Sequence, residues 1–90
     1  TMSFTPKPGL LTQRLDGEYI VFDPQNDRVH TLNTTAQLIW LKCAERLGID
    51  EMITEITTRY DVPRETVHRD IHQAVSQLCD LGLLCPAGAH

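Results

Sequence analysis

Polar and apolar residues alternate along the first third of the chain, and turn-forming residues separate three short runs. The runs occupy residues 10–15, 18–23 and 28–32. Asp16-Gly17 lies between the first two and is typical of a two-residue hairpin turn, and Pro24 can open the second turn. Because short turns join consecutive strands, the pattern predicts an antiparallel meander with the third strand at an edge.

A helical period replaces the alternation after the third run. Asn33 is a suitable N-cap, and Gly48 is the expected end of the first helix. The apolar positions of this helix repeat at three- and four-residue intervals and form one stripe: Ala36, Ile39, Trp40, Cys43 and Leu47.

Two further helices follow. Asp50 is the predicted cap of the second, which has Ile53, Ile56 and Tyr60 on one side. Pro63 suits the first position of the third helix, and Gly82 is its expected end. The predicted buried stripe of this third helix is Val67, Ile71, Ala74, Leu78 and Leu81.

These elements predict the fold class. The second and third helices are joined by a short turn, as in a helix-turn-helix. The chain is therefore expected to be an α+β protein, a small winged-helix-like domain with an N-terminal three-stranded antiparallel sheet followed by three helices. Its 90 residues suit a single domain spanning residues 1–90, with an ordered core at about residues 10–84.

Composition limits the possible binding partners and the cellular location of the chain. The net charge of −4 disfavours non-specific nucleic-acid binding, which needs clustered Lys and Arg. No apolar run approaches the roughly 18 residues of a membrane span, so no membrane association is expected. Three cysteines without CxxC spacing argue against a disulfide framework and a four-ligand zinc site. A reducing cytoplasm is the simplest predicted location.

Candidate chemistry is sparse. His68 and His72 lie four residues apart, but Arg69 occupies the position where a zinc-protease helix carries glutamate. No nucleophile elbow, glycine-rich phosphate loop or recognisable carboxylate pair is present. The sequence therefore predicts no metal, no cofactor and no enzymatic activity.

Several segments, taken in order, resemble the PqqD-like family. They are "GEYIVFD", then H-x-L-N-x-x-A from His30 to Ala36, then Trp40, "ITEITTRYDV" at residues 53–62, Asp70-Ile71, and L-x-x-L-G-L-L at residues 78–84. The similarity covers roughly residues 10–84. Each match is a core or cap position, so the order and spacing carry the resemblance.

The resemblance implies a peptide chaperone, also called a RiPP recognition element. Such a domain binds the leader segment of a ribosomally made precursor peptide. The leader would add as a strand beside the third strand and lie in a groove against the third helix. The implied second partner is a peptide-modifying enzyme, such as a radical SAM enzyme or a leader peptidase.

An unpaired strand edge is physically suited to this task, since it is a template for another chain. About four or five backbone hydrogen bonds, at roughly 0.5–1.5 kcal/mol each, fall short of the ~8 kcal/mol of micromolar binding. Apolar anchors must supply the remainder. Sequence leaves open which flank of the third helix faces the strand. The candidate peptide-binding residues are Arg28, Val29, His30, Thr31, His68, Asp70, Ile71, His72, Ala74 and Val75.

Two other functions stay open. A winged-helix DNA reader would use the third helix, where Arg64 and Arg69 are offset by acidic neighbours, so few phosphate contacts are expected. Strand-mediated homodimerisation would use the same third-strand edge without a foreign ligand.

Overall fold

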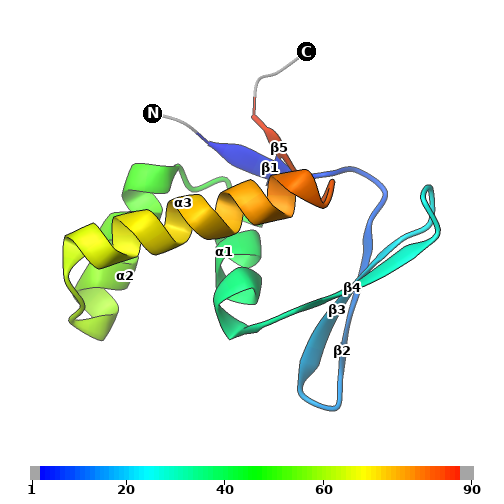
Figure 1. The fold of residues 1–90 in the computed structure, drawn as a ribbon, viewed down its shortest axis with the longest axis horizontal. Helices are drawn as coiled ribbons and strands as arrows, with labels where there is room; N and C mark the ends of the chain where they lie inside the picture. Colours follow the sequence, from blue (N-terminus) through cyan, green and yellow to red (C-terminus); the bar gives the residue numbers. More distant parts are fainter. Residues whose placement is uncertain (1–2, 88–90) are drawn as a thin grey trace.

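The computed structural model of the chain describes residues 3–87, and the outermost residues of the predicted 1–90 domain lie outside this range. The fold is α+β, as predicted: a three-stranded antiparallel sheet is followed by three helices (Figure 1). The elements are β1 (Phe4–Pro6), β2 (Leu11–Leu15), β3 (Glu18–Asp23), β4 (Arg28–Leu32), α1 (Thr34–Ala44), α2 (Ile49–Tyr60), α3 (Arg64–Asp80) and β5 (Leu84–Pro86).

The main sheet has the predicted meander order β2-β3-β4. Asp16 and Gly17 form the two-residue turn between β2 and β3, with φ values of 52° and 80°. These left-handed values identify a type I′ hairpin turn, whose twist matches that of the flanking strands. Leu15 pairs with Glu18 across this turn, and β3 continues into antiparallel pairing with β4.

A second, two-stranded sheet joins the two ends of the chain, and sequence analysis did not predict it. β1 pairs antiparallel with β5, and Thr5 lies opposite Cys85. The Lys7 amide donates to the Leu83 carbonyl at 3.0 Å, and the Ala87 amide donates to the Ser3 carbonyl at 2.9 Å. Strands of three residues are too short to show an alternating pattern, so only tertiary pairing reveals them.

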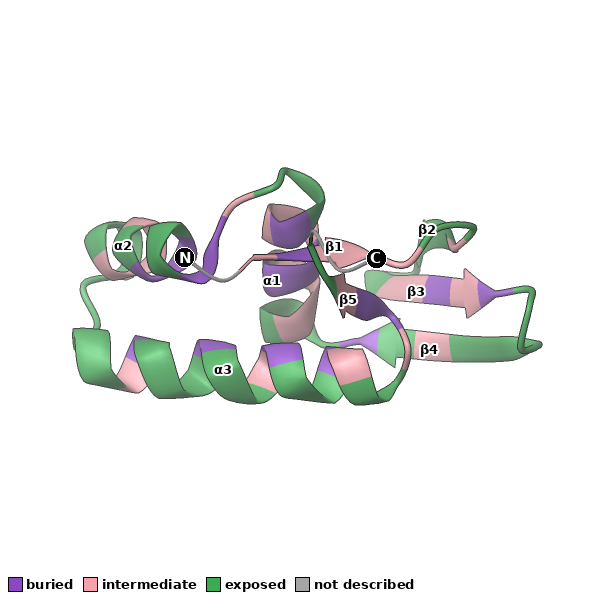
Figure 2. Cartoon of the chain, turned by 90° about the horizontal axis from the view of Figure 1, so that it is seen from above, coloured by how far each residue is buried: buried purple, intermediate pink, exposed green. Residues whose placement is uncertain are grey.

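The core lies where the three helices meet the inner face of the sheet and the β1–β5 pair (Figure 2). Trp40 is buried, and its indole N–H donates to the Leu83 carbonyl at 3.4 Å. The Tyr19 ring lies 5.9 Å from the Trp40 ring and so connects the sheet to α1. The core side chains are Phe4, Val21, Leu32, Ile39, Trp40, Cys43, Ile49, Met52, Ile53, Val67, Ile71, Val75, Leu78, Leu83 and Leu84.

The predicted boundary between the first two helices is wrong. Gly48 does not end α1; the chain leaves that helix at Ala44, and Arg46 takes the left-handed conformation with φ 68°. Gly48 instead caps α2, and its amide donates to the Glu51 carboxylate at 3.0 Å. Asp50, the predicted cap, lies in the first turn of α2, where its negative charge favours the helix dipole. Pro63 precedes α3 as its N-cap and is not the first helical residue.

The predicted buried stripe of the third helix also needs correction. In α3, Val75 is buried in place of Ala74, and Leu81 is 48% exposed because the helix has already ended at Asp80. In α2 the buried side chains are Ile49, Met52 and Ile53, and Tyr60 is 54% exposed. The stripe of α1 is confirmed at its centre by Ile39, Trp40 and Cys43.

Within residues 3–87, no helix has the length and apolar character needed to cross a membrane.

Candidate functional site

The β4 edge of the sheet is open. β3 has a neighbour on each side, whereas β4 pairs only with β3 among the residues that the structure describes. β4 lies on the side of the molecule that carries α3, and β2 lies on the opposite side (Figures 1 and 2). The predicted position of the third strand at an edge is therefore confirmed.

The type I′ turn determines which way each backbone group of β4 points. In a two-residue hairpin the residues flanking the turn, here Leu15 and Glu18, form a hydrogen-bonded pair. Hydrogen-bonded and non-hydrogen-bonded pairs then alternate, so Val21 of β3 directs its backbone groups toward β4. Val21 lies opposite His30. The backbone of His30 therefore faces β3, while the N–H and C=O groups of Val29 and Thr31 face outward.

Side chains of β4 alternate between the two faces of the sheet. His30 lies on the inner face, and its buried Nε2 atom has no hydrogen-bond partner within residues 3–87. Val29, 64% exposed, and Thr31 lie on the outer face. Arg28 is exposed at the start of the strand. An added strand would therefore meet apolar and hydroxyl groups on one face and an imidazole on the other.

A small polar pocket follows β4 toward α3. It has a volume of about 220 Å³ and lies between the start of α1 and one flank of α3. Asp70 is the one charged residue among its described lining residues, and Gln73 and Gln77 add amide groups. The complete lining is Asn33, Thr35, Ala36, Asp70, Gln73, Ala74 and Gln77.

An apolar pocket of about 330 Å³ adjoins the polar one and shares Thr35 and Asp70 with it. α1, α2 and α3 all contribute, and Tyr60 and Val62 are its exposed apolar residues. Sequence analysis placed Ile56 and Tyr60 on one side of the second helix but did not identify this pocket. Its lining is Thr34, Thr35, Leu38, Ile39, Ile56, Tyr60, Val62, Thr66, Val67, Asp70 and Ile71.

A larger hollow of about 640 Å³ runs along α2, but no residue of β4 or α3 lines it. Most of its lining side chains are charged or hydroxylated, among them Asp50, Glu51 and Arg59. Leu47 is the one apolar side chain among its described lining residues.

The structure separates five of the six predicted α3 residues into three groups, and the sixth, His68, is exposed beside His72. Asp70 and Ala74 line the polar pocket beyond β4. Ile71 and Val75 are core residues, 2% and 3% exposed. His72 lines a different hollow, together with residues such as Phe4 and Cys79.

The two α3 histidines are exposed and adjacent. The rings of His68 and His72 lie 4.4 Å apart. Within residues 3–87, no group of three or more His, Cys, Asp or Glu side chains could hold a metal ion. A pair of imidazoles alone does not complete a four-ligand zinc site.

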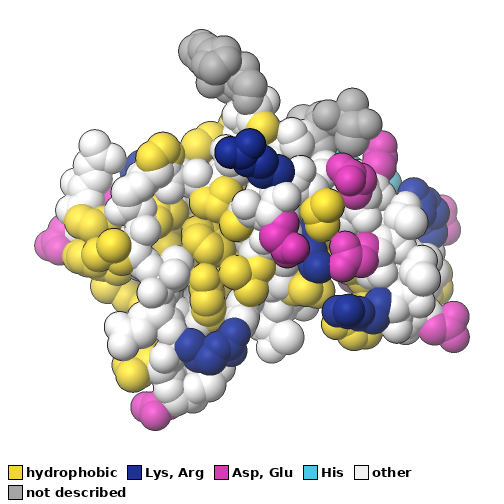
Figure 3. Space-filling view, turned by 180° about the vertical axis from the view of Figure 1, so that it is seen from behind, with side chains coloured by type: hydrophobic (Ala, Val, Ile, Leu, Met, Phe, Trp, Pro, Cys, Tyr) yellow, Lys and Arg dark blue, Asp and Glu magenta, His cyan; other side chains and the backbone are white. Residues whose placement is uncertain are grey.

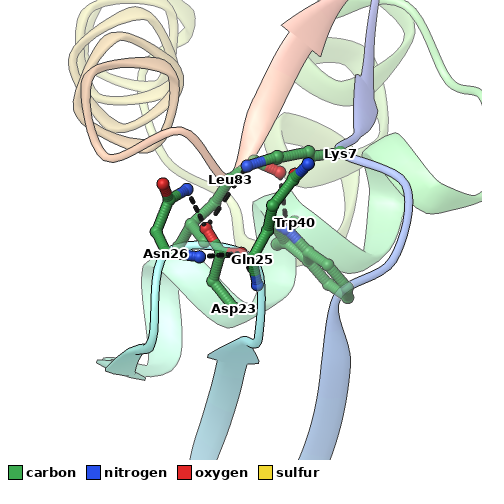
Figure 4. A network of polar contacts seen from close by, with 6 residues as sticks. All are labelled: Lys7, Asp23, Gln25, Asn26, Trp40 and Leu83. Carbon is green, nitrogen blue, oxygen red and sulfur yellow. Dashed lines mark hydrogen bonds and ion pairs between the residues drawn. The ribbon is translucent and has the colours of Figure 1, made fainter.

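Asp23 organises the turn that leads into β4 (Figure 4). Its buried carboxylate accepts hydrogen bonds from the Asn26 side chain at 2.8 Å, from the backbone N–H of Gln25 at 3.2 Å and from the Lys7 ammonium at 3.3 Å. The Asn26 hydrogen bond is the main cause that lowers the pKa of Asp23; desolvation opposes it, and Lys7 adds to it. The turn is thus held by an ionised side chain that also ties it to the segment after β1.

Cys43 and Cys79 are placed as structural side chains. All three cysteines are free, and Cys43 is fully buried against α3 and the other core residues. Desolvation raises the pKa of the Cys43 thiol to about 11, and it also raises the pKa of Cys79. A thiol with a raised pKa stays protonated near neutral pH and is a poor nucleophile.

Solved structures with the same architecture include two protein–peptide complexes. One, described as "Lasso peptide synthetase B1 complexed with the leader peptide", has a TM-score of 0.83 and 25% sequence identity; the similarity covers 93% of this chain and 99% of that one. The other, "TbiB1 in Complex with the TbiA(beta) Leader Peptide", has a TM-score of 0.80 and 23% identity, covering 96% and 98% of the two chains. No curated protein matches this chain.

The sequence model of one protein family covers most of the described fold. Residues 18–84 match the family described as coenzyme PQQ synthesis protein D. This range runs from the start of β3 to the start of β5 and includes the edge strand β4 and α3. The chain therefore belongs to the PqqD family.

Proposed function

We propose that this chain is a non-catalytic chaperone that binds the leader segment of a ribosomally made precursor peptide and presents it to a modifying enzyme. The observation that carries the proposal is the open β4 edge, which is followed in the chain by Asn33 and Thr34, residues that line the pockets beside α3. Two structural relatives were solved with leader peptides, which supports the assignment. The modifying enzyme would be a radical SAM enzyme or a leader peptidase.

The leader would extend the sheet as a strand beside β4. Val29 and Thr31 each offer one outward N–H and one outward C=O, so about four backbone hydrogen bonds can form. At roughly 0.5–1.5 kcal/mol each, these bonds contribute about 2–6 kcal/mol. Micromolar affinity requires ~8 kcal/mol, so side chains of the peptide must contribute as well.

The two pockets beside α3 provide places for those side chains. Successive residues of an added strand point to opposite faces, so every second side chain would point toward the α1–α3 side. The apolar pocket can bury one hydrophobic side chain against Leu38, Tyr60 and Val62. Full burial of such a side chain contributes about 1.5–3 kcal/mol, so the upper end of the total, about 9 kcal/mol, reaches the ~8 kcal/mol of micromolar binding.

Asp70 lies where the polar and apolar pockets join. Since it is the one charged residue among the described linings of both, the groove favours a hydrogen-bond donor or a cationic side chain at this position of the peptide. A single exposed charge is screened by salt, so only a modest salt dependence of peptide binding is expected.

The resulting site is smaller than the set of residues chosen from sequence. It consists of β4 residues and the polar flank of α3: Arg28, Val29, His30, Thr31, Asp70 and Ala74. Ile71 and Val75 would support this site from the core. His68 and His72 lie on another part of α3, where a partner other than the bound strand would meet them.

The test compares one proline substitution at each edge of the sheet. Thr31→Pro removes an outward donor of β4, and Thr12→Pro is the matched control on β2. The probe is a fluorescent synthetic peptide that carries the leader segment of the precursor encoded beside this gene. We expect Thr31→Pro to weaken binding tenfold or more, about 1.4 kcal/mol, and Thr12→Pro to retain wild-type affinity.

Fluorescence anisotropy titrations measure the affinity of each folded variant for the leader peptide. Wild-type affinity in Thr31→Pro would show that β4 is not the docking edge.

A duplex DNA probe is titrated in parallel at physiological salt, where no binding is expected from a chain of net charge −4. Tight DNA binding with a steep salt slope would contradict the assignment as a peptide chaperone.

A further inference from the structure

The proposed function leaves the β2 edge of the sheet unused. β2 ends the sheet on the side opposite β4 and pairs only with β3 among residues 3–87. All five of its residues are exposed, including Leu11 at 59% and Leu15 at 51%. The strand contains no proline, and its pairing with β3 is continuous, without a bulge. Natural proteins usually protect a long exposed edge of this kind, so an open one indicates an interface.

The type I′ turn also determines the backbone directions in β2. Leu11, Gln13 and Leu15 occupy hydrogen-bonded pairs with β3, by the alternation that starts at the turn. The N–H and C=O groups of Thr12 and Arg14 therefore point outward. These two residues are equally spaced about Gln13, which makes the edge symmetrical about that residue.

From this symmetry we propose that the β2 edge binds the β2 edge of a second copy of this chain, antiparallel and about a two-fold axis beside Gln13. Thr12 then pairs with Arg14 of the second copy, and Arg14 pairs with Thr12 of the second copy. Both pairs consist of outward-facing residues, so about four backbone hydrogen bonds form across the axis. The two three-stranded sheets become one continuous sheet, and the same patch serves both subunits, as a two-fold interface requires.

The side chains are complementary in the same register. Leu11 lies opposite Leu15 of the second copy, and Leu15 lies opposite Leu11, so each exposed leucine covers another. Both pairs lie on the outer face of the sheet, where they continue the apolar surface formed with Phe22 of β3. Cross-strand apolar pairs of this kind are the main side-chain stabilisation of an antiparallel ladder.

The neighbouring registers of the β2–β2 pairing place less favourable side chains opposite each other. A shift that places Arg14 opposite Arg14 of the second copy brings like charges together on one face. A shift in the other direction places Thr12 opposite Thr12, sets Leu11 against Gln13, and runs the ladder into Gly9. Gly9 has φ 86°, a conformation that ends the strand. The sequence LTQRL therefore selects the register centred on Gln13.

The position of this edge leaves the peptide groove free. Seen from the side away from α3, hydrophobic side chains gather over the half of the molecule that holds the sheet, and charged side chains are more concentrated over the helices (Figure 3). The β4 edge and α3 lie on the opposite side (Figures 1 and 2). Each subunit of the dimer could then hold its own peptide, and the dimer does not depend on the proposed function.

The dimer is expected to be weak, because one pair of short strands buries less surface than a standard interface. Sedimentation velocity from about 5 to about 500 µM, a range that suits a small interface, should therefore show a concentration-dependent monomer–dimer equilibrium. A single monomeric species over the whole range would overturn the proposal.

Charge-pair variants test the register. In L11K/L15K each lysine lies opposite a lysine of the second copy, and in L11E/L15E each glutamate lies opposite a glutamate. Both variants should therefore be folded monomers. An equimolar mixture places lysine opposite glutamate at both positions, and it should form a heterodimer that dissociates at high salt. A mixture that remains monomeric would contradict the antiparallel register centred on Gln13.

Proline variants identify the edge. Thr12→Pro should raise the dimer dissociation constant at least tenfold, and Thr31→Pro should leave it unchanged. This pattern is the reverse of the one expected for peptide binding, so the two proposals can fail separately. Loss of the dimer in Thr31→Pro, with retention in Thr12→Pro, would assign dimerisation to β4 and contradict the proposal.

Discussion

Asp23 shows how one residue positions the start of the candidate site. It is the one buried charged residue among the described side chains, 3% exposed, and it accepts hydrogen bonds from the turn that follows it. Lys7, from the segment after β1, pairs with the same carboxylate. The residue thus ties the β3–β4 turn to the N-terminal part of the chain, and the direction of β4 depends on both.

The lowered pKa of Asp23 makes this support dependent on pH. A carboxyl whose pKa is lower in the folded state than in the unfolded state, here 3.8, stabilises the fold fully above the unfolded value. This stabilisation is lost as the pH falls from the unfolded-state pKa through the lower folded-state pKa. Thermal unfolding between about pH 7 and pH 2.5 should therefore show a steep drop in Tm of the wild type below about pH 4.

Asp23→Asn should have a lower Tm than the wild type at pH 7 and a smaller drop below pH 4. The amide cannot accept as many hydrogen bonds and does not pair with Lys7. Glu18→Gln, an exposed carboxylate at the start of β3, is the control and should leave both features unchanged. Parallel Tm curves for wild type and Asp23→Asn would show that Asp23 is not the titrating support.

At the scale of the strand, adjacent residues of β4 differ in the direction of their backbone N–H and C=O groups, which point alternately toward β3 and outward. His30 pairs inward with Val21, whereas Thr31 faces the open edge. His30→Pro removes an internal donor and leaves the Val21 carbonyl without its partner. We expect a loss of about 2–4 kcal/mol in the free energy of unfolding, measured by urea denaturation.

Thr31→Pro should cost less than about 1 kcal/mol, because its N–H has no partner within the sheet. Both substitutions keep proline within the same five-residue strand, so each is the control for the other. The opposite order of stability would show that the hydrogen-bond phase derived from the Asp16-Gly17 turn is wrong.

At the scale of the whole molecule, the two chain ends complete the core. β1 and β5 pair next to α1 and α3, and Phe4 is buried among the core side chains (Figure 2). The β1 strand lies outside the range 10–84 that sequence analysis predicted as the ordered core. A domain of 90 residues buries a limited apolar surface, so each such side chain matters.

Phe4→Ala should therefore lower the free energy of unfolding by about 3–5 kcal/mol, a large share of the ~5–15 kcal/mol of a typical domain. Leu81→Ala is the matched control, since Leu81 is apolar but 48% exposed, and its expected change is within about 0.5 kcal/mol. Urea denaturation measures both. A change below 1 kcal/mol in Phe4→Ala would show that the β1–β5 pair is not part of the cooperative fold.

Local patterns in the sequence were sufficient for the elements of the fold. The Asp16-Gly17 turn, the Asn33 cap and the α1 stripe act over a few residues, so their chemistry is readable without tertiary contacts. The three strands of the main sheet and the edge position of β4 followed from them. Family membership followed as well, because the order of the matching segments is itself a property of the sequence.

Patterns failed where a residue's environment depends on distant parts of the chain. Gly48 was expected to end a helix, but it begins the next one, since glycine suits both positions and only the packing of α2 decides between them. Leu81 follows the apolar spacing of the third helix yet is exposed, because α3 ends at Asp80 and Leu81 is its C-cap.

The candidate site divides in the same way. The sequence by itself determined that β4 is an edge strand and that α3 is the neighbouring long helix. Which flank of α3 lines the pocket at the start of α1, and which backbone groups of β4 and β2 point outward, only the tertiary structure decided. Helix rotation and strand phase are relative quantities: they depend on how Asp70, His30 and Thr12 are placed against partners that are distant in the chain.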